Sequence, residues 1–306
     1  MTIIQYSKEE LRLLQLNELE MLIELDRICR KNGINYSLDG GTLLGAIRHK
    51  GFIPWDDDVD VMMLKEEYEA FYKACISDLD TNRFFFQDYR TDPGYRWGYG
   101  KLRSKQTEYI KAGHEKAKYK TGVCIDVFGF DNIPDNKVAR AIFLAKMYCL
   151  RKITYSELGR YNSDKRILRK WYSLLYCIPK AAVFSVKQRI DKKYATRITK
   201  NVINSMLPFP KKECKYGFPK KWFDNYIEVE FEGMQFLSIK NYDSFLKLKY
   251  EDYMALPPEG GRKGVMDASV LKLKKLSLRE LQARYWEENR NTSKVQSDHK
   301  DTSCVE

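Results

Sequence analysis

The sequence predicts an α+β protein in which a mixed sheet forms the core and a strongly basic helical segment follows it. Strand-like and helix-like patterns are interspersed through residues 1–135, whereas residues 136–206 consist mainly of long helical stretches. With 306 residues, of which 43% are hydrophobic and 31% charged, the chain has the composition of a globular protein and enough length to bury a large core.

A long helix is predicted over residues 8–31. Ser7 and Glu10 fit a capping box at its start, leucines and isoleucines recur at near-helical spacing, and Gly33 supplies a left-handed stop. The next elements are expected in this order: a strand near 34–38, a Gly-Gly turn, a helix over 42–48, a strand over 58–64, a helix over 66–79, and strands over 83–90, 96–110 and 122–130. Together they form the predicted catalytic core, residues 1–135.

The helical segment that follows is unusually basic. Residues 137–200 contain 17 Lys and Arg against 3 Asp and Glu, a net charge of +14, whereas the whole chain carries +12. Cations mixed with aromatic and aliphatic residues suit an anionic membrane interface, and the charge alone also suits nucleic acid or a polyphosphate. The alternative is a helical insert, residues 136–206, that packs on the core and merely exposes its basic side. Its helices are expected to break around Gly159 and Pro179.

The part after the insert, residues 207–288, is expected to complete the active site. A hairpin with a Glu-Gly turn is predicted over 226–239, and a helix over 242–258 is expected to end at a proline pair. Residues 289–306 are polar and are expected to form a disordered tail.

The sequence shows no signal for export or membrane insertion. No run approaches the apolar length that a spanning helix needs, and the first residues lack the charged and apolar pattern of a signal peptide. The protein is therefore expected in the cytoplasm, and peripheral contact with the inner face of an anionic membrane is one interpretation of the basic segment.

The most informative stretch is FIPWDDDVDVMM, residues 52–63. Asp56, Asp57, Asp58 and Asp60 fall within five positions, and carboxylates this close repel one another. Asp58 and Asp60 alternate along a predicted strand, so their side chains point to the same face. Asp56 and Asp57 are expected to shape or hydrate the preceding turn.

Asp126 lies between two apolar residues on another predicted strand. If that strand neighbours the one that carries Asp58 and Asp60, three carboxylates converge and require a cation. Oxygen ligands suit a hard ion such as Mg²⁺, with Mn²⁺ as the alternative. The sequence therefore predicts a metal site at these three aspartates.

A phosphate site is predicted beside it, at Gly40, Gly41 and Thr42. A Gly-Gly turn before a helix presents backbone N–H groups to a phosphate, helped by the positive end of the helix. A metal and a phosphate cradle together indicate phosphoryl transfer. In this order along the chain, the motifs match the pattern of a nucleotidyltransferase-like fold.

The stretch YSLDGGTLLGAIRHKGFIPWDDDVDVMM closely resembles the signature of the LicD family, the phosphocholine transferases related to fukutin, and the resemblance extends to GYGKLRSKQT, TGVCIDVFGFDNIPD and YEDYMALPP. It implies an enzyme that moves a phospho-alcohol, commonly phosphocholine, from a CDP-linked donor to a sugar hydroxyl, with release of CMP. The acceptor it implies is a surface glycan, such as teichoic acid or lipopolysaccharide, or a lipid-linked precursor. By this resemblance Asp58 and Asp60 bind Mg²⁺, and Asp126 completes the metal site or acts as the base.

Two alternatives remain open at this point. CDP-choline is the favoured donor, but CDP-ribitol or CDP-glycerol would use the same chemistry. A basic nucleic-acid-binding protein would bind any strand with a steep salt dependence. It would give no reason for the Gly-Gly-Thr and aspartate motifs, so no nucleic acid is expected as a partner.

Three basic residues could contact the donor phosphates. Arg48 follows the Gly-Gly motif, and Lys101 and Arg103 alternate onto one face of a predicted strand. The alternative for each is an ordinary surface charge.

Three aromatic residues could enclose the quaternary ammonium of choline. Trp55, Trp97 and Tyr99 would form such a box through cation–π attraction, although core or rim packing is the commoner use of these residues.

Overall fold

Strands and helices are interspersed in the first half of the chain, and three consecutive helices follow them. In order the elements are α1 (Lys8–Asn32), β1 (Ser37–Leu38), α2 (Gly40–His49), β2 (Asp60–Leu64), α3 (Lys65–Asp78), β3 (Phe84–Gln87), β4 (Gly100–Ser104), β5 (Glu108–Lys111), β6 (Cys124–Ile133), α4 (Lys137–Asn162), α5 (Arg166–Tyr176), α6 (Lys180–Ala195), β7 (Asn201–Ile203), β8 (Phe218–Pro219), η2 (Lys220–Phe223), β9 (Tyr226–Phe231), β10 (Met234–Ile239), α7 (Tyr242–Tyr250), η3 (Glu259–Gly261), β11 (Ala268–Lys272) and α8 (Leu278–Asp301). The computed structural model describes residues 4, 6–195, 199–208, 216–262, 264 and 267–301, with side chains through residue 290.

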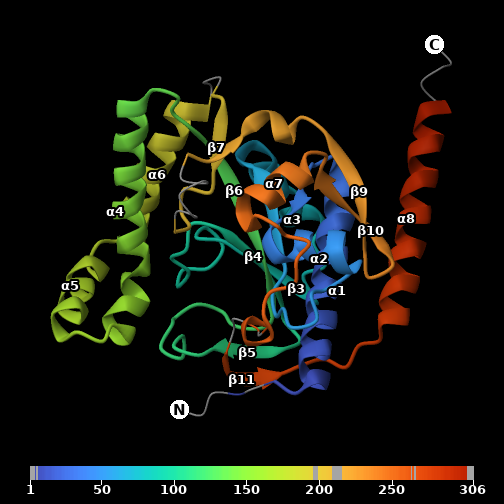
Figure 1. Cartoon of the computed structure of the whole chain (residues 1–306), viewed down its shortest axis with the longest axis horizontal. Helices are drawn as coiled ribbons and strands as arrows, with labels where there is room; N and C mark the ends of the chain where they lie inside the picture. Colours follow the sequence, from blue (N-terminus) through green and yellow to red (C-terminus); the bar gives the residue numbers. More distant parts are fainter. Residues whose placement is uncertain are drawn as a thin grey trace.

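A mixed sheet of seven strands lies at the centre of the molecule (Figure 1). Its main order is β1-β2-β6-β4-β3, and β7 and β8 extend it from the far end of β6. β2 and β6 are parallel, whereas the other pairings described in this sheet are antiparallel. The predicted α+β class and the mixed sheet are confirmed.

The predicted first helix is α1. The Ser7 hydroxyl accepts the N–H of Glu10, the Glu10 carboxylate accepts the N–H of Ser7, and Gly33 ends the helix at φ 62°. Burial extends over most of its length, because the hydrophobic core packs around it. α1 therefore serves as the central support against which the sheet and the active-site strands pack.

Several boundaries differ from the sequence-based expectation, and β2 begins at Asp60, two residues later than predicted. The single strand expected over 96–110 is divided into β4 and β5, because β5 leaves the central sheet and pairs with β11. The Gly-Gly pair opens α2 instead of forming a turn before it. α7 ends at Tyr250, well before the prolines, because Glu251 adopts φ 59° and its N–H binds the carbonyl of Lys247.

The basic segment forms α4, α5 and α6 at one side of the sheet, with α5 beyond α4 (Figure 1). The break expected at Gly159 falls instead at residues 163–165, because Gly159 continues α4 and leaves room for the ring of Tyr172. The break at Pro179 is confirmed. A second hydrophobic cluster joins α4 and α6 to the end of β6 and comprises Ile133, Phe143, Met147, Leu150, Val183, Ile203 and Met206.

The C-terminal tail is helical where it is described. Residues 289–301 are described as a continuation of α8 to Asp301, and residues 302–306 of the tail that was expected to be disordered lie outside the described residues. Leu281 and Tyr285 are buried and anchor the start of α8, and extending an existing helix needs no new nucleation. Within the described residues, no helix combines the length and apolarity required to cross a membrane.

Candidate active site

The predicted aspartates meet where β2 and β6 run side by side. Asp60 is the first residue of β2 and lies in register with Asp126 on β6, and Asp58 precedes Asp60 by two residues. Burial and the charges of Asp126 and Asp57 raise the pKa of Asp58 to about 6. Burial and the charges of Asp58 and Asp126 raise the pKa of Asp60 well above its usual range. The structure therefore brings the three carboxylates close enough to repel one another.

Lys101 supplies a cation on the other side of Asp126. The two residues are partners in the β4–β6 ladder, and the Lys101 ammonium forms an ion pair with the Asp126 carboxylate. Burial lowers the pKa of Lys101, but the combined effects of Asp126, Cys124 and Tyr99 outweigh it and raise the pKa overall. Lys101 is therefore held as a charged, partly buried group beside Asp126, and its contact with a donor phosphate stays a prediction.

More carboxylates surround the cluster than the sequence suggested. Burial, followed by the charges of Asp58 and Asp57, raises the pKa of Asp56 to about 7. Glu18 of α1 is buried with its pKa raised well above its usual range, and its Oε2 has no hydrogen-bond partner within the described residues. Asp39 forms an ion pair with Lys249 of α7 at 2.6 Å. Negative charge exceeds the compensating positive charge throughout this region.

The two glycines let carboxylates approach the start of α2. The N–H of Gly40 donates to the Asp39 carboxylate at 2.6 Å, so Asp39 caps the helix. A Cβ on Gly41 would lie 2.4 Å from Oδ2 of Asp56, which is closer than real Cβ contacts allow. Any side chain larger than hydrogen at Gly41 would therefore displace the Asp56 carboxylate.

Thr42 holds the start of β2. Its hydroxyl accepts the backbone N–H of Asp60 at 2.9 Å, and its side chain is buried. In the structure these residues position Asp39, Asp56 and Asp60, since the positive end of a helix attracts carboxylates. The phosphate contact expected at Gly40, Gly41 and Thr42 stays a prediction.

A cavity of about 150 Å³ opens beside Asp58 and Asp126. It is lined by Asp58, Trp97, Tyr99, Lys101, Arg103, Tyr109, Ile110, Lys111, His114, Tyr119, Thr121, Cys124 and Asp126. Of the residues predicted to bind substrate, Lys101, Arg103, Trp97 and Tyr99 are brought together here, and the rings of Trp97 and Tyr99 have centroids 6.3 Å apart. Arg103 is held in place because its guanidinium donates to Gln87 and to the carbonyl of Gly122.

Two predicted substrate contacts lie elsewhere. Trp55 packs edge-on against His49, with ring centroids 6.2 Å apart, and does not line the cavity, so it forms no box with Trp97 and Tyr99. Arg48 donates to the carbonyls of Tyr253 and Ala255, which fixes the loop after α7 to the end of α2. These contacts give its guanidinium a structural role, and the phosphate contact expected from the sequence stays a prediction.

The donor set fits a hard cation in its chemistry, although no closed metal site is preformed among the described residues. The carboxylates of Asp56, Asp58 and Asp60 carry raised pKa values because they are buried and because neighbouring carboxylates repel their negative charge. A divalent ion would offset that repulsion with the oxygen ligands it prefers. No three His, Cys, Asp or Glu side chains within the described ranges already form a metal-binding group, and Asp126 is engaged by Lys101.

Several cavity residues were missed by sequence reasoning. Lys111, His114 and Tyr119 come from β5 and the loop after it, where no motif distinguishes them. Burial and the charge of Lys111 lower the pKa of His114 to about 4, and its Nδ1 contacts the Tyr119 hydroxyl. Asp39 could have been found, since an Asp directly before a helix is a typical N-cap.

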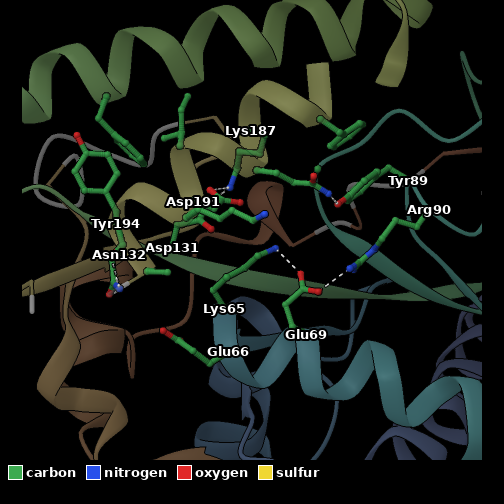
Figure 2. A pocket seen from close by; sticks show the side chains of 17 residues that line it. Lys65, Glu66, Glu69, Tyr89, Arg90, Asp131, Asn132, Lys187, Asp191 and Tyr194 are labelled. Carbon is green, nitrogen blue, oxygen red and sulfur yellow. Dashed lines mark hydrogen bonds and ion pairs between the residues drawn. The ribbon is translucent and has the colours of Figure 1, made fainter. Parts of the chain in front are cut away.

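A larger cavity, of about 500 Å³, lies between α3 and the helices α4 and α6 (Figure 2). Its charged groups pair with one another: Lys187 contacts Asp131 at 2.9 Å and Asp191 at 2.5 Å, and Glu69 bridges Lys65 and Arg90. None of the predicted site residues lines it. Among these ion pairs, the buried pair of Lys187 with Asp131 attaches α6 to β6.

Comparison with known proteins identifies the family of the chain. The family model of the LicD/FKTN/FKRP nucleotidyltransferase domain matches residues 33–155, which include all three aspartates. The lipopolysaccharide cholinephosphotransferase LicD of Haemophilus influenzae is 30% identical over 272 residues, which cover 84% of this chain and 96% of that protein. Human and mouse ribitol 5-phosphate transferase FKRP are each 54% identical over 35 residues, 11% of this chain and 7% of theirs. The chain therefore belongs to the LicD family.

Proposed function

We propose that this protein transfers phosphocholine from CDP-choline to a hydroxyl of a cell-surface glycan or its lipid-linked precursor and releases CMP. The observation that carries the proposal is its similarity, over nearly the full length of both chains, to a lipopolysaccharide cholinephosphotransferase. The aspartate cluster supports it, because the chemistry requires a site that gathers negative charge around a phosphate-bound cation. Lipopolysaccharide is the acceptor suggested by that relative, and teichoic acid is the alternative glycan.

In this proposal Mg²⁺, or Mn²⁺ in its place, is held by Asp58 and Asp60, with Asp126 as a third ligand or as the base. When bound, the ion supplies charge neutralisation for the donor diphosphate. The in-register pairing of Asp60 and Asp126 supports this placement, because both side chains start from adjacent points of neighbouring strands. Thr42 holds the amide of Asp60 and so fixes the direction of its carboxylate.

The transfer itself needs one base and several cations. The acceptor oxygen attacks the phosphorus that carries choline, and the bond from that phosphorus to the bridging oxygen of CMP breaks. If Asp126 is the base, its carboxylate accepts the proton of the acceptor hydroxyl. Lys101, Arg103 and Lys111 line the cavity beside it and would stabilise the phosphate oxygens.

The choline group fits the aromatic part of the cavity. The lining of the cavity includes Trp97, Tyr99 and Tyr119. A quaternary ammonium is attracted to the faces of such aromatic rings. The nearby aspartates add a long-range attraction for the same positive charge. This arrangement favours choline over the neutral alcohols ribitol and glycerol.

The same chemistry with CDP-ribitol is the second candidate. The local 54% identity to ribitol 5-phosphate transferases favours it. CDP-glycerol is a third donor of the same kind. Nucleic-acid binding has no support from the cavity, whose cations face carboxylates and aromatic rings.

The test compares donors on the purified full-length protein. CMP release is measured with CDP-choline, CDP-ribitol and CDP-glycerol, each with Mg²⁺, with Mn²⁺ and with excess chelator, in the presence of lipopolysaccharide or teichoic acid as acceptor. We expect release from CDP-choline that depends on the metal and on one acceptor. Release from CDP-ribitol alone would transfer the assignment to the second candidate, and release from none would refute the proposal.

A further inference from the structure

Helix α5 exposes an apolar stripe that no other described element covers. Ile167, Trp171 and Leu174 follow the i, i+4, i+7 spacing of one helix face, and their exposed fractions are 74%, 54% and 64%. Three large apolar side chains in one row are a patch, not isolated surface residues, and such patches mark interaction sites.

The opposite side of α5 is already occupied. Tyr172 is buried against α4, where its ring meets Tyr155 edge-on at 5.5 Å between centroids. Tyr176 packs under the guanidinium of Arg160, 3.7 Å from the ring centroid. α5 is therefore attached to α4 by one side, and the stripe of Ile167, Trp171 and Leu174 remains outside. Figure 1 shows α5 at the outer edge of the molecule, beyond α4.

The surface around the stripe carries almost no negative charge. Glu157, one of the three acids in residues 137–200, is buried and accepts the N–H of Lys118. Asp191 is turned inward and pairs with Lys187 in the larger cavity (Figure 2). Asp164 is the one acid of this segment that is exposed. The folding of the insert therefore removes most of its negative charge from the outer surface, which the sequence alone could not show.

Cations stand next to the apolar stripe. Lys165, Arg166, Arg169 and Lys170 are all exposed, and they alternate with Ile167 and Trp171 along the same helix. Apolar side chains flanked by Lys and Arg are the pattern of a helix that lies in a membrane interface, with the cations among anionic head groups. An α-helix of 11 residues is about 16 Å long, too short to span a bilayer but suited to lie along its surface.

We propose that α5 docks the protein on an anionic lipid surface through Ile167, Trp171 and Leu174, with the surrounding Lys and Arg binding the head groups. Charge complementarity selects this partner over a second copy of the chain, because two equally cationic faces would repel one another. The proposal rests on the proposed function in one respect: a lipid-linked acceptor would lie at that surface. Lipid binding itself does not depend on catalysis.

The test is vesicle co-sedimentation of the full-length protein. We expect binding to vesicles of phosphatidylcholine with about 30% phosphatidylglycerol, weak binding to pure phosphatidylcholine, and loss of binding as salt increases. Leu174→Glu and Trp171→Glu are expected to weaken binding at least tenfold. Ile76→Glu is the matched control, because Ile76 is a 72% exposed side chain on α3, outside the insert, and this change should leave binding unaltered.

Two further measurements separate the ways in which the test could fail. Thermal unfolding of each variant checks that the fold is intact, and CMP release with a water-soluble acceptor checks that the active site is intact. Loss of lipid binding with unchanged CMP release supports the docking face. Equal binding by Leu174→Glu and the parent protein, or a change of oligomeric state in place of lipid binding, would overturn the proposal and leave the proposed function untouched.

Discussion

Asp126 lies between two partners of opposite charge: Asp60 faces it from the parallel strand β2, and Lys101 pairs with it from the antiparallel strand β4. The sheet therefore fixes the order Asp60, Asp126, Lys101 across three adjacent strands. Removing a charge at either side changes the balance that Asp126 experiences. The electrostatic environment of Asp126 therefore depends on both neighbouring strands.

Asp60→Asn and Asp58→Asn are expected to lower the rate of CMP release by a factor on the order of 10²–10³, the size seen when one preorganised electrostatic group is lost from an active site. Stability should be unchanged or increased, because each change removes a buried negative charge from a repelling cluster. Steady-state kinetics and thermal unfolding check both halves. Full activity in either variant would contradict the assigned role.

Gly41→Ala is expected to displace the Asp56 carboxylate, since the new Cβ would lie 2.4 Å from its Oδ2. We expect a loss of about 1–3 kcal/mol in the free energy of unfolding, which is typical of overpacking, and reduced CMP release. Gly260→Ala is the matched control, because a Cβ at that position would have no described heavy atom within 4 Å apart from its chain neighbours. Denaturant unfolding of both variants decides the comparison.

Trp97→Ala is expected to raise the KM for CDP-choline about 2- to 30-fold, which corresponds to ~0.5–2 kcal/mol of cation–π attraction. The KM for CDP-ribitol should change little, because ribitol carries no cation. Trp55→Ala is the control, since Trp55 lies outside the cavity. If both donors were affected equally, Trp97 would be a packing residue and not a choline contact.

Lys187→Met is expected to destabilise the protein by about 3–5 kcal/mol, because it leaves Asp131 and Asp191 buried without their cation. Lys192→Met, at an exposed position beside the same cavity, should change the free energy of unfolding by less than about 0.5 kcal/mol. Urea unfolding measures both. A small effect of Lys187→Met would show that the insert is held to the core chiefly by its apolar cluster.

Asp191 gives the protein a pH-dependent stability. Burial and the charge of Asp131 raise its pKa from 3.8 to about 6, so the folded state binds the proton more tightly than the unfolded chain does. Stability should therefore fall as the pH rises from about 4 to about 6, by at most about 3 kcal/mol from this group. The slope of unfolding free energy against pH should be smaller in Asp191→Asn. An identical slope would mean that other groups dominate this range.

The sequence predicted most of the local structure and the convergence of the aspartates. The capping box at Ser7 and the hairpin over 226–239 are confirmed, and the strand predicted over 58–64 is present as β2 from Asp60, because each depends on neighbouring residues. The adjacency of Asp60 and Asp126 could be stated only as a condition. It depends on the pairing of strands that are far apart along the chain.

What the sequence could not predict depends on packing. Trp55 and Trp97 are both tryptophans near a motif, yet only Trp97 lines the cavity. Trp97 lies shortly before β4, whereas Trp55 packs against His49 of α2. Arg48 looked like a phosphate ligand, but the loop at Tyr253 occupies its guanidinium. Lys249 forms an ion pair with Asp39, which lies 210 residues earlier in the chain, and no local sequence pattern predicts such a contact.

Residues from the last third of the chain contact the candidate site, which is built mainly from the first half. β11 pairs with β5, whose residues line the catalytic cavity, and α7 contributes the lysine that neutralises Asp39. A nascent chain that has emerged only as far as the basic helices would possess its aspartates but neither β11, which pairs with β5, nor the lysine of α7. We therefore expect a polypeptide truncated before α7 to hold β5 and Asp39 less firmly, although it contains all three aspartates.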